Sequence, residues 1–60
     1  MFRSIGYDPA TATLEVEYNN GQIERRTGVS MEAYQGMMAS DSIGKYFHAH
    51  IKKHSTIVTA

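Results

Sequence analysis

The first half of the chain has the alternating hydrophobic pattern that is typical of β-strands. Three stretches are predicted to be strands: residues 2–7, 13–18 and 22–27. In the second stretch, Leu14, Val16 and Tyr18 fall on one face and Glu15 and Glu17 on the other. Because successive side chains of a strand point to opposite faces, this stretch is predicted to be half-buried.

Short turns are predicted between these strands, and the second turn leaves two alternatives open. The single proline of the chain presets the first turn. Asn20 and Gly21 both tolerate positive φ and predict a tight hairpin. A two-residue turn would direct Arg25 to the inner face of the sheet, whereas a three-residue turn would direct Glu24 and Arg26 there instead.

After Gly28 the spacing of the apolar residues becomes helical. Ser30 is predicted to cap a helix that ends near Ser40. A second helix is predicted to begin between Ser40 and Ser42 and to run to about His54. The apolar stripes that these helices would bury are Tyr34, Met37 and Met38 in the first, and Ile43, Phe47 and Ile51 in the second.

Together these elements predict one small α+β domain over residues 1–60. We expect a three-stranded antiparallel β-meander followed by two α-helices packed on one face. The last six residues are weakly patterned, and they either fray or pack back through Ile57 and Val58. A chain of this length buries only about 60 % of its unfolded surface, so a deep pocket would remove much of its core. The length therefore favours a binding module over an enzyme.

Composition and charge narrow the classes of function further. Lys and Arg number six and Asp and Glu number six, so the formal net charge is zero. A neutral chain is not a general binder of polyanions such as duplex nucleic acid. Cysteine is absent, which excludes disulfides and thiolate zinc sites. The sequence shows no membrane-spanning run and no signal peptide, so we expect a cytoplasmic monomer that binds no membrane.

The patterns that would indicate catalysis, a metal or a cofactor are missing. The sequence has no Gly-x-Ser-x-Gly motif, no phosphate-binding glycine loop and no distinct carboxylate pair. His50 and His54 have the i,i+4 spacing that lets two imidazoles share a metal. Their segment, however, offers no acidic residue or cysteine to complete a site. We therefore predict no enzyme activity, no metal and no cofactor.

Positive charge gathers in two parts of the chain. Residues 42–60 contain three lysines, three histidines and no acidic residue. This segment either complements a helix dipole or forms a basic patch for phosphate or an acidic protein surface. Arg25 and Arg26 form a second cluster, with Arg3 on what is expected to be a neighbouring strand. Glutamates on the same sheet either neutralise these arginines or leave them to bind a partner.

Several short motifs follow one another along the chain. They are Ile5-Gly6-Tyr7-Asp8, Leu14-Glu15-Val16-Glu17-Tyr18, Gly21, Gly28-Val29, Tyr34, Ser40-x-x-x-Gly44-Lys45-Tyr46-Phe47 and Ile51. In order and spacing they resemble the KTSC domain, a family named for the C-terminal domain of some lysyl-tRNA synthetases. The resemblance covers about residues 2–54 and implies a stand-alone small bacterial or phage protein that binds RNA. More loosely, the chain resembles small phage proteins that bind host RNA polymerase.

The chain departs from that family at three places. The family's central Tyr-x-Tyr falls here on Glu24 and Arg26, its proline after the valine is Ser30, and its asparagine after Tyr-Phe is His48. If the tyrosine pair stacks on bases, this chain lacks that device. The departure therefore favours a protein partner over RNA.

We predict a non-enzymatic interaction module of the phage type, which regulates transcription by binding a host protein such as RNA polymerase in the host cytoplasm. It would cover a surface that another factor needs, or add a strand to a sheet edge. The residues predicted to bind the partner are Phe2, Arg3, Ile5, Tyr7, Arg25 and Arg26.

The alternative is an RNA-binding module that uses the basic second helix and the arginines of the third strand. Stacking of bases on aromatic rings is the usual device for single-stranded RNA, and Tyr46 and Tyr7 are the candidates for it. The residues of the second helix predicted to bind RNA are Lys45, Tyr46, Lys52 and Lys53.

Overall fold

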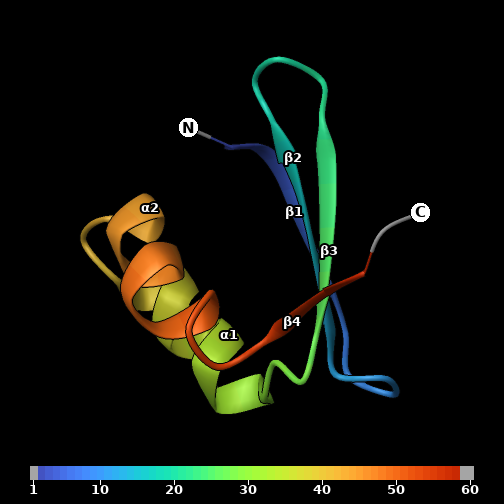
Figure 1. The fold of residues 1–60 in the computed structure, drawn as a ribbon. Coiled ribbons are helices and arrows are strands. Elements are labelled where there is room, and N and C mark those ends of the chain that lie inside the picture. The colour runs from blue at the N-terminus through green and yellow to red at the C-terminus, as the bar shows by residue number, and fades with distance from the viewer. Residues whose placement is uncertain (1, 59–60) are drawn as a thin grey trace.

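The structure is a computed structural model that describes residues 2–58. The chain forms a β-sheet with a helical layer on one of its faces (Figure 1). The sheet is antiparallel and its strand order is β1-β2-β3-β4. The strands are β1 (Phe2–Asp8), β2 (Thr13–Tyr18), β3 (Ile23–Thr27) and β4 (Thr56–Val58). β1 and β4 are therefore the edges, and β2 separates β1 from β3.

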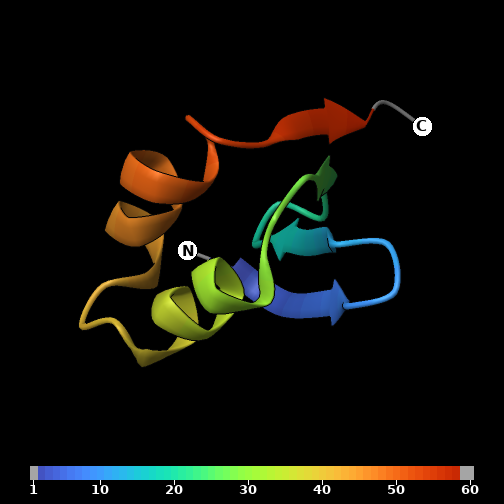
Figure 2. The same cartoon turned by 90° about the horizontal axis from the view of Figure 1, so that it is seen from below.

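The helical layer consists of α1 (Met31–Ala39), α2 (Ile43–Tyr46) and a π-helical turn, η1 (Phe47–Ile51). Figure 2 shows these elements on the same side of the sheet. Ser30 caps α1, because its hydroxyl accepts a hydrogen bond from the N–H of Ala33 at 3.1 Å. In η1 the N–H of Lys52 donates to the carbonyl of Phe47, five residues back, at 2.9 Å. No helix of the described residues is long and apolar enough to cross a bilayer.

The core lies between the sheet and the helices. Its fully buried residues, none more than 2 % exposed, are Leu14, Val16, Val29, Met37, Phe47 and Ile51. Aromatic contacts extend it to the edge strand: the ring of Phe2 packs edge-on against Phe47 at 5.3 Å between centroids. Tyr7 stacks on Tyr34 at 4.7 Å and donates to the carbonyl of Val29 at 2.7 Å. The alternation of β2 thus positions the core as the sequence predicts.

The prediction of three strands is wrong by one strand. Residues 56–58 form β4 and pair with β3, with Ile57 opposite Arg26. This part of the C-terminal segment therefore pairs with the sheet rather than fraying, but the side chains of Ile57 and Val58 stay exposed, at 49 % and 44 %. Residues 59–60 lie outside the described residues. The second helix also ends earlier than predicted, at Ile51, because a turn over residues 52–54 leads the chain to β4.

The hairpin between β2 and β3 adopts the three-residue alternative. Val16 lies opposite Glu24 and Leu14 lies opposite Arg26, so both charged side chains face the helical layer. Gly21 has a φ of 89°, which is the left-handed conformation that closes a three-residue hairpin loop. The glycine thereby allows the register that sends an acid and a base to the inner face.

Candidate binding groove

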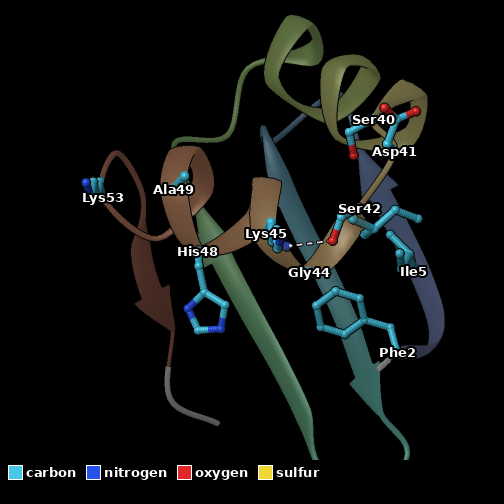
Figure 3. A pocket seen from close by; sticks show the side chains of 11 residues that line it. Phe2, Ile5, Ser40, Asp41, Ser42, Gly44, Lys45, His48, Ala49 and Lys53 are labelled. Atoms are coloured by element: carbon cyan, nitrogen blue, oxygen red, sulfur yellow. Dashed lines mark hydrogen bonds between the residues drawn. The ribbon is translucent and has the colours of Figure 1, made fainter.

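An open groove of about 1020 Å³ lies between the edge strand β1 and the start of α2 (Figure 3). Ile5 lies opposite the buried Val16, so its side chain reaches the groove from the inner face of the sheet. The other wall begins at Ser42, the residue that precedes α2. Its hydroxyl accepts a hydrogen bond from the N–H of Lys45 at 3.4 Å and so caps this helix. The side chains that give the groove its character are Phe2, Ile5, Asp41, Lys45, His48 and Lys53.

The groove combines an apolar floor with a basic rim. In Figure 3, Phe2 and Ile5 reach it from β1, and the rings of Phe2 and His48 project to the same side of α2. Lys45 and Lys53 add two positive charges, against the one carboxylate of Asp41. Every ion pair within residues 2–58 involves an arginine, so both lysines are available to an anionic ligand.

The arginines of the outer sheet face are neutralised by glutamates. Arg25 lies opposite Glu15 in the sheet, and its Nε is 2.5 Å from Glu15 Oε1. Arg3 Nη1 is 3.6 Å from Glu17 Oε2. All four side chains are exposed or half-exposed, so each pair stabilises the fold only slightly. The outer face is therefore a salt-bridged surface, in which glutamates neutralise the arginines.

The third arginine forms a half-buried network on the inner face. Arg26 Nε lies 2.5 Å from Glu24 Oε2, and their side chains are 12 % and 14 % exposed. The Tyr18 hydroxyl donates to the other oxygen of Glu24 at 2.9 Å. Arg26 also donates from Nη1 to the carbonyl of Ser55 at 3.4 Å and lies over the Phe47 ring, 5.8 Å from its centroid. Arg26 therefore connects β3 to the segment that leads into β4.

The same network predicts an unusual tyrosine titration. Burial, reinforced by the hydrogen bond to the Glu24 carboxylate, raises the pKa of Tyr18 from 10.0 to about 12. Between pH 10 and 12 Tyr18 loses its proton in the unfolded state but keeps it in the folded state. Its contribution to the free energy of unfolding is therefore fully present below pH 10 and is lost as the pH rises towards 12. An ultraviolet absorbance titration should show one tyrosine ionising near pH 12, and Tyr18→Phe should remove that step. A variant that titrates like the parent would contradict this role for Tyr18.

The aromatic rings of the domain pack against one another and against histidine rings. All six aromatic residues are buried or half-buried. The ring of Tyr46 lies 4.5 Å from that of His50, and a Cβ added at Gly36 would lie 3.0 Å from Tyr46 Cζ. The phenol is thus held between η1 and α1, while Tyr7 is stacked on Tyr34. Both predicted stacking candidates, Tyr7 and Tyr46, are therefore half-buried and packed against another ring.

The structure brings together only part of each predicted set. Phe2 and Ile5 from the first set share the groove with Lys45 and Lys53 from the second. The remaining predicted residues lie elsewhere: Arg3 and Arg25 on the outer face, and Tyr7, Arg26, Tyr46 and Lys52 within packed surroundings. Asp41 and His48 also line the groove, but nothing in the sequence signals that they face β1. No cluster of three metal-ligating side chains occurs in the part of the chain described.

The fold defines a small α+β domain. The profile of the KTSC domain family matches residues 1–54, and the chain belongs to this family. An uncharacterized protein of Stutzerimonas stutzeri (strain A1501) is 40 % identical over 50 residues, which cover 83 % of this chain and 70 % of that protein. The crystal structure of a KTSC domain protein from Yersinia pestis superposes with a TM-score of 0.85 at 32 % identity, over 95 % of this chain and 80 % of that one.

Proposed function

We propose that this KTSC domain is a non-enzymatic interaction module whose groove binds an acidic surface of another protein. The observation that carries the proposal is a contrast between two sets of cations. The arginines of the sheet are paired with glutamates, whereas Lys45 and Lys53 line the groove without an acidic residue within ion-pair distance among the described residues.

The apolar floor of the groove favours a protein partner over a free anion. Phe2 and Ile5 offer apolar surface beside the two lysines. Burial of apolar surface supplies most of the affinity of a protein interface, and charges on its rim accelerate and orient the encounter. The partner is therefore an acidic surface that carries at least one apolar side chain.

A component of the transcription machinery, such as RNA polymerase, is the partner that we propose. Support comes from the looser resemblance to small phage proteins that bind this enzyme. A standard interface buries about 800 Å² on each partner, which is about a fifth of the 4013 Å² surface of this domain. A domain of this size would regulate by occupying a surface that another factor needs.

RNA binding is the second candidate, and the free lysines are the observation that favours it. The phosphate backbone attracts such lysines without regard to sequence. The aromatic rings of the described residues are buried or half-buried, which disfavours the stacking on bases that single-strand binders use. We therefore rank RNA below a protein partner.

A pull-down with a matched charge control tests the proposal. Lys45→Gln with Lys53→Gln removes two positive charges from the groove, and Arg3→Gln with Arg25→Gln removes two from the outer face. We expect tagged protein to retain RNA polymerase subunits from a bacterial lysate after nuclease treatment. The groove variant should lose them and the outer-face variant should keep them, because the groove lysines have no acidic partner among the described residues whereas Arg3 and Arg25 are paired.

Two results would contradict this expectation. Partners that disappear with nuclease would restore the RNA-binding alternative. Equal retention by the parent and the groove variant would show that the groove is not the binding surface. Circular dichroism of both variants is the control for folding, and neither should change because all four side chains are on the surface.

A further inference from the structure

The first strand leaves one of its edges open beside the groove. β1 is the first strand of the sheet order and, among the described residues, pairs only with β2. Its register is regular over residues 4–8, after an irregularity between Phe2 and Ser4. A strand at the edge of a sheet carries unpaired N–H and C=O groups that can pair with another chain. Residues 4–7 carry no charge and no proline, so this stretch of the edge lacks both of those blocks, while the charged Arg3 and Asp8 flank it.

The groove and this edge form one continuous surface. Phe2 and Ile5 belong to β1, and they also line the groove. Figure 3 shows Phe2 below α2 and Ile5 beside it, both on the strand that borders the groove. A strand that pairs with β1 would place alternate side chains on the inner face of the sheet. Those side chains would then lie beside Ile5 and face the helical wall of the groove, which carries Lys45 and, at its far end, Lys53.

The other edge of the sheet does not offer the same combination. β4 has only three residues, and none of them lines the groove. Lys52 and Lys53 lie in the turn that leads into β4, but the apolar side chains that line the groove from the sheet, Phe2 and Ile5, belong to β1. The length of β1 and its share in the groove lining therefore favour β1 over β4 as the edge that binds a partner strand.

We infer that β1 and the groove together bind an extended acidic segment of the partner, which adds to the sheet as a fifth strand. The inference rests on the proposed function, and it adds the backbone conformation and the side-chain pattern of the ligand. The segment places apolar side chains on Phe2 and Ile5 and acidic side chains on Lys45 and Lys53. Backbone hydrogen bonds to β1 supply affinity, and the alternate side chains supply specificity.

Synthetic peptides provide the test. The probe is the labelled peptide Thr-Val-Thr-Glu-Thr-Val-Thr-Glu, which presents valine and glutamate on one face when extended. Its charge control has lysine in place of glutamate, and oligouridine of eight nucleotides represents RNA. We expect the acidic peptide to bind in fluorescence anisotropy, and the lysine peptide and oligouridine not to bind. Lys45→Gln with Lys53→Gln should weaken the acidic peptide about tenfold, the effect of two surface ion pairs.

Two N-methylated forms of the acidic peptide test the strand pairing itself. One is methylated on the threonine amides and the other on the valine and glutamate amides. Alternate amides of a strand point to opposite sides, so only one form has methyl groups toward β1. We expect that form to bind at least about tenfold more weakly, through the loss of several hydrogen bonds, and the other form to bind normally.

Each contrary outcome overturns a different statement. If both methylated peptides bind as well as the parent peptide, strand addition is wrong and groove binding stands. If oligouridine binds and the acidic peptide does not, the groove is a nucleic-acid site and the proposed function fails as well. If neither ligand binds while the pull-down retains RNA polymerase, the extended-segment inference is wrong and the protein-binding function survives.

Discussion

Phe47→Ala is expected to unfold a large fraction of the domain. Phe47 is 1 % exposed and is among the largest fully buried side chains. Truncation of a buried phenylalanine costs about 3–5 kcal/mol. At about 0.05–0.15 kcal/mol for each residue, a domain of this length has about 3–9 kcal/mol in total. One substitution therefore removes a third or more of the stability.

The position of Phe47 explains why the loss would be at the upper end. Its ring contacts Phe2 from the edge strand, and the charged groups of Arg26 and Lys52 lie over it at 5.8 and 5.6 Å from the centroid. A cavity at this point would remove packing from β1, from β3 and from η1 together. Small domains have few other contacts that could compensate.

Urea denaturation followed by circular dichroism measures this effect. Met38→Ala is the control, because Met38 is 45 % exposed and its truncation should change the free energy of unfolding by about 0.5 kcal/mol or less. Phe47→Leu should fall between the two. A Phe47→Ala protein whose urea midpoint equals that of Met38→Ala would show that the core is not centred on this ring.

The sequence was a good guide where local periodicity and burial coincide. The alternation in β2 predicted Leu14 and Val16 as core, and both are 1 % exposed. The hydroxyl of Ser30 predicted the start of α1. In each case the information lies within a few residues, so no knowledge of distant contacts is needed.

The sequence was a poor guide where a distant segment decides the outcome. β4 is three residues long and has no pattern of its own, and it exists because β3 offers a free edge. The hairpin register depends on whether Glu24 and Arg26 find partners on the inner face. Those partners are Tyr18 and Ser55, and Ser55 is nearly thirty residues further along the chain. Neither propensity nor alternation contains that information.

The groove could be predicted only in fragments for the same reason. Phe2 and Ile5 were expected to contact a partner, and Lys45 and Lys53 were expected to contact RNA, as two separate hypotheses. The fold places β1 against the start of α2, some forty residues later, and so merges the two sets. The arginines that looked equally suitable in the sequence are instead paired by cross-strand neighbours, which depends on register.

Arg26→Ala is expected to be the most damaging change at a charged residue of the sheet. It would leave the Glu24 carboxylate half-buried without its cation, and would remove the donor to Ser55 and the contact with Phe47. Loss of one partner from a fully buried ion pair costs about 3–5 kcal/mol. Because the side chains of Arg26 and Glu24 are 12 % and 14 % exposed, we expect the free energy of unfolding to fall by less, about 2–3 kcal/mol. By contrast, Arg25→Ala breaks an exposed pair and should cost at most about 1 kcal/mol.

A double-mutant cycle separates the charge from the packing. Glu24→Gln removes the carboxylate charge and keeps an oxygen that can accept from Tyr18. Combined with Arg26→Met, it leaves no unpaired charge and keeps an apolar stem over Phe47. Because the penalty in the single variant comes from the stranded charge, we expect the double variant to be more stable than Arg26→Met alone. Urea midpoints that simply add would mean that the two side chains stabilise the fold independently, and that the ion pair does not hold the register of β3.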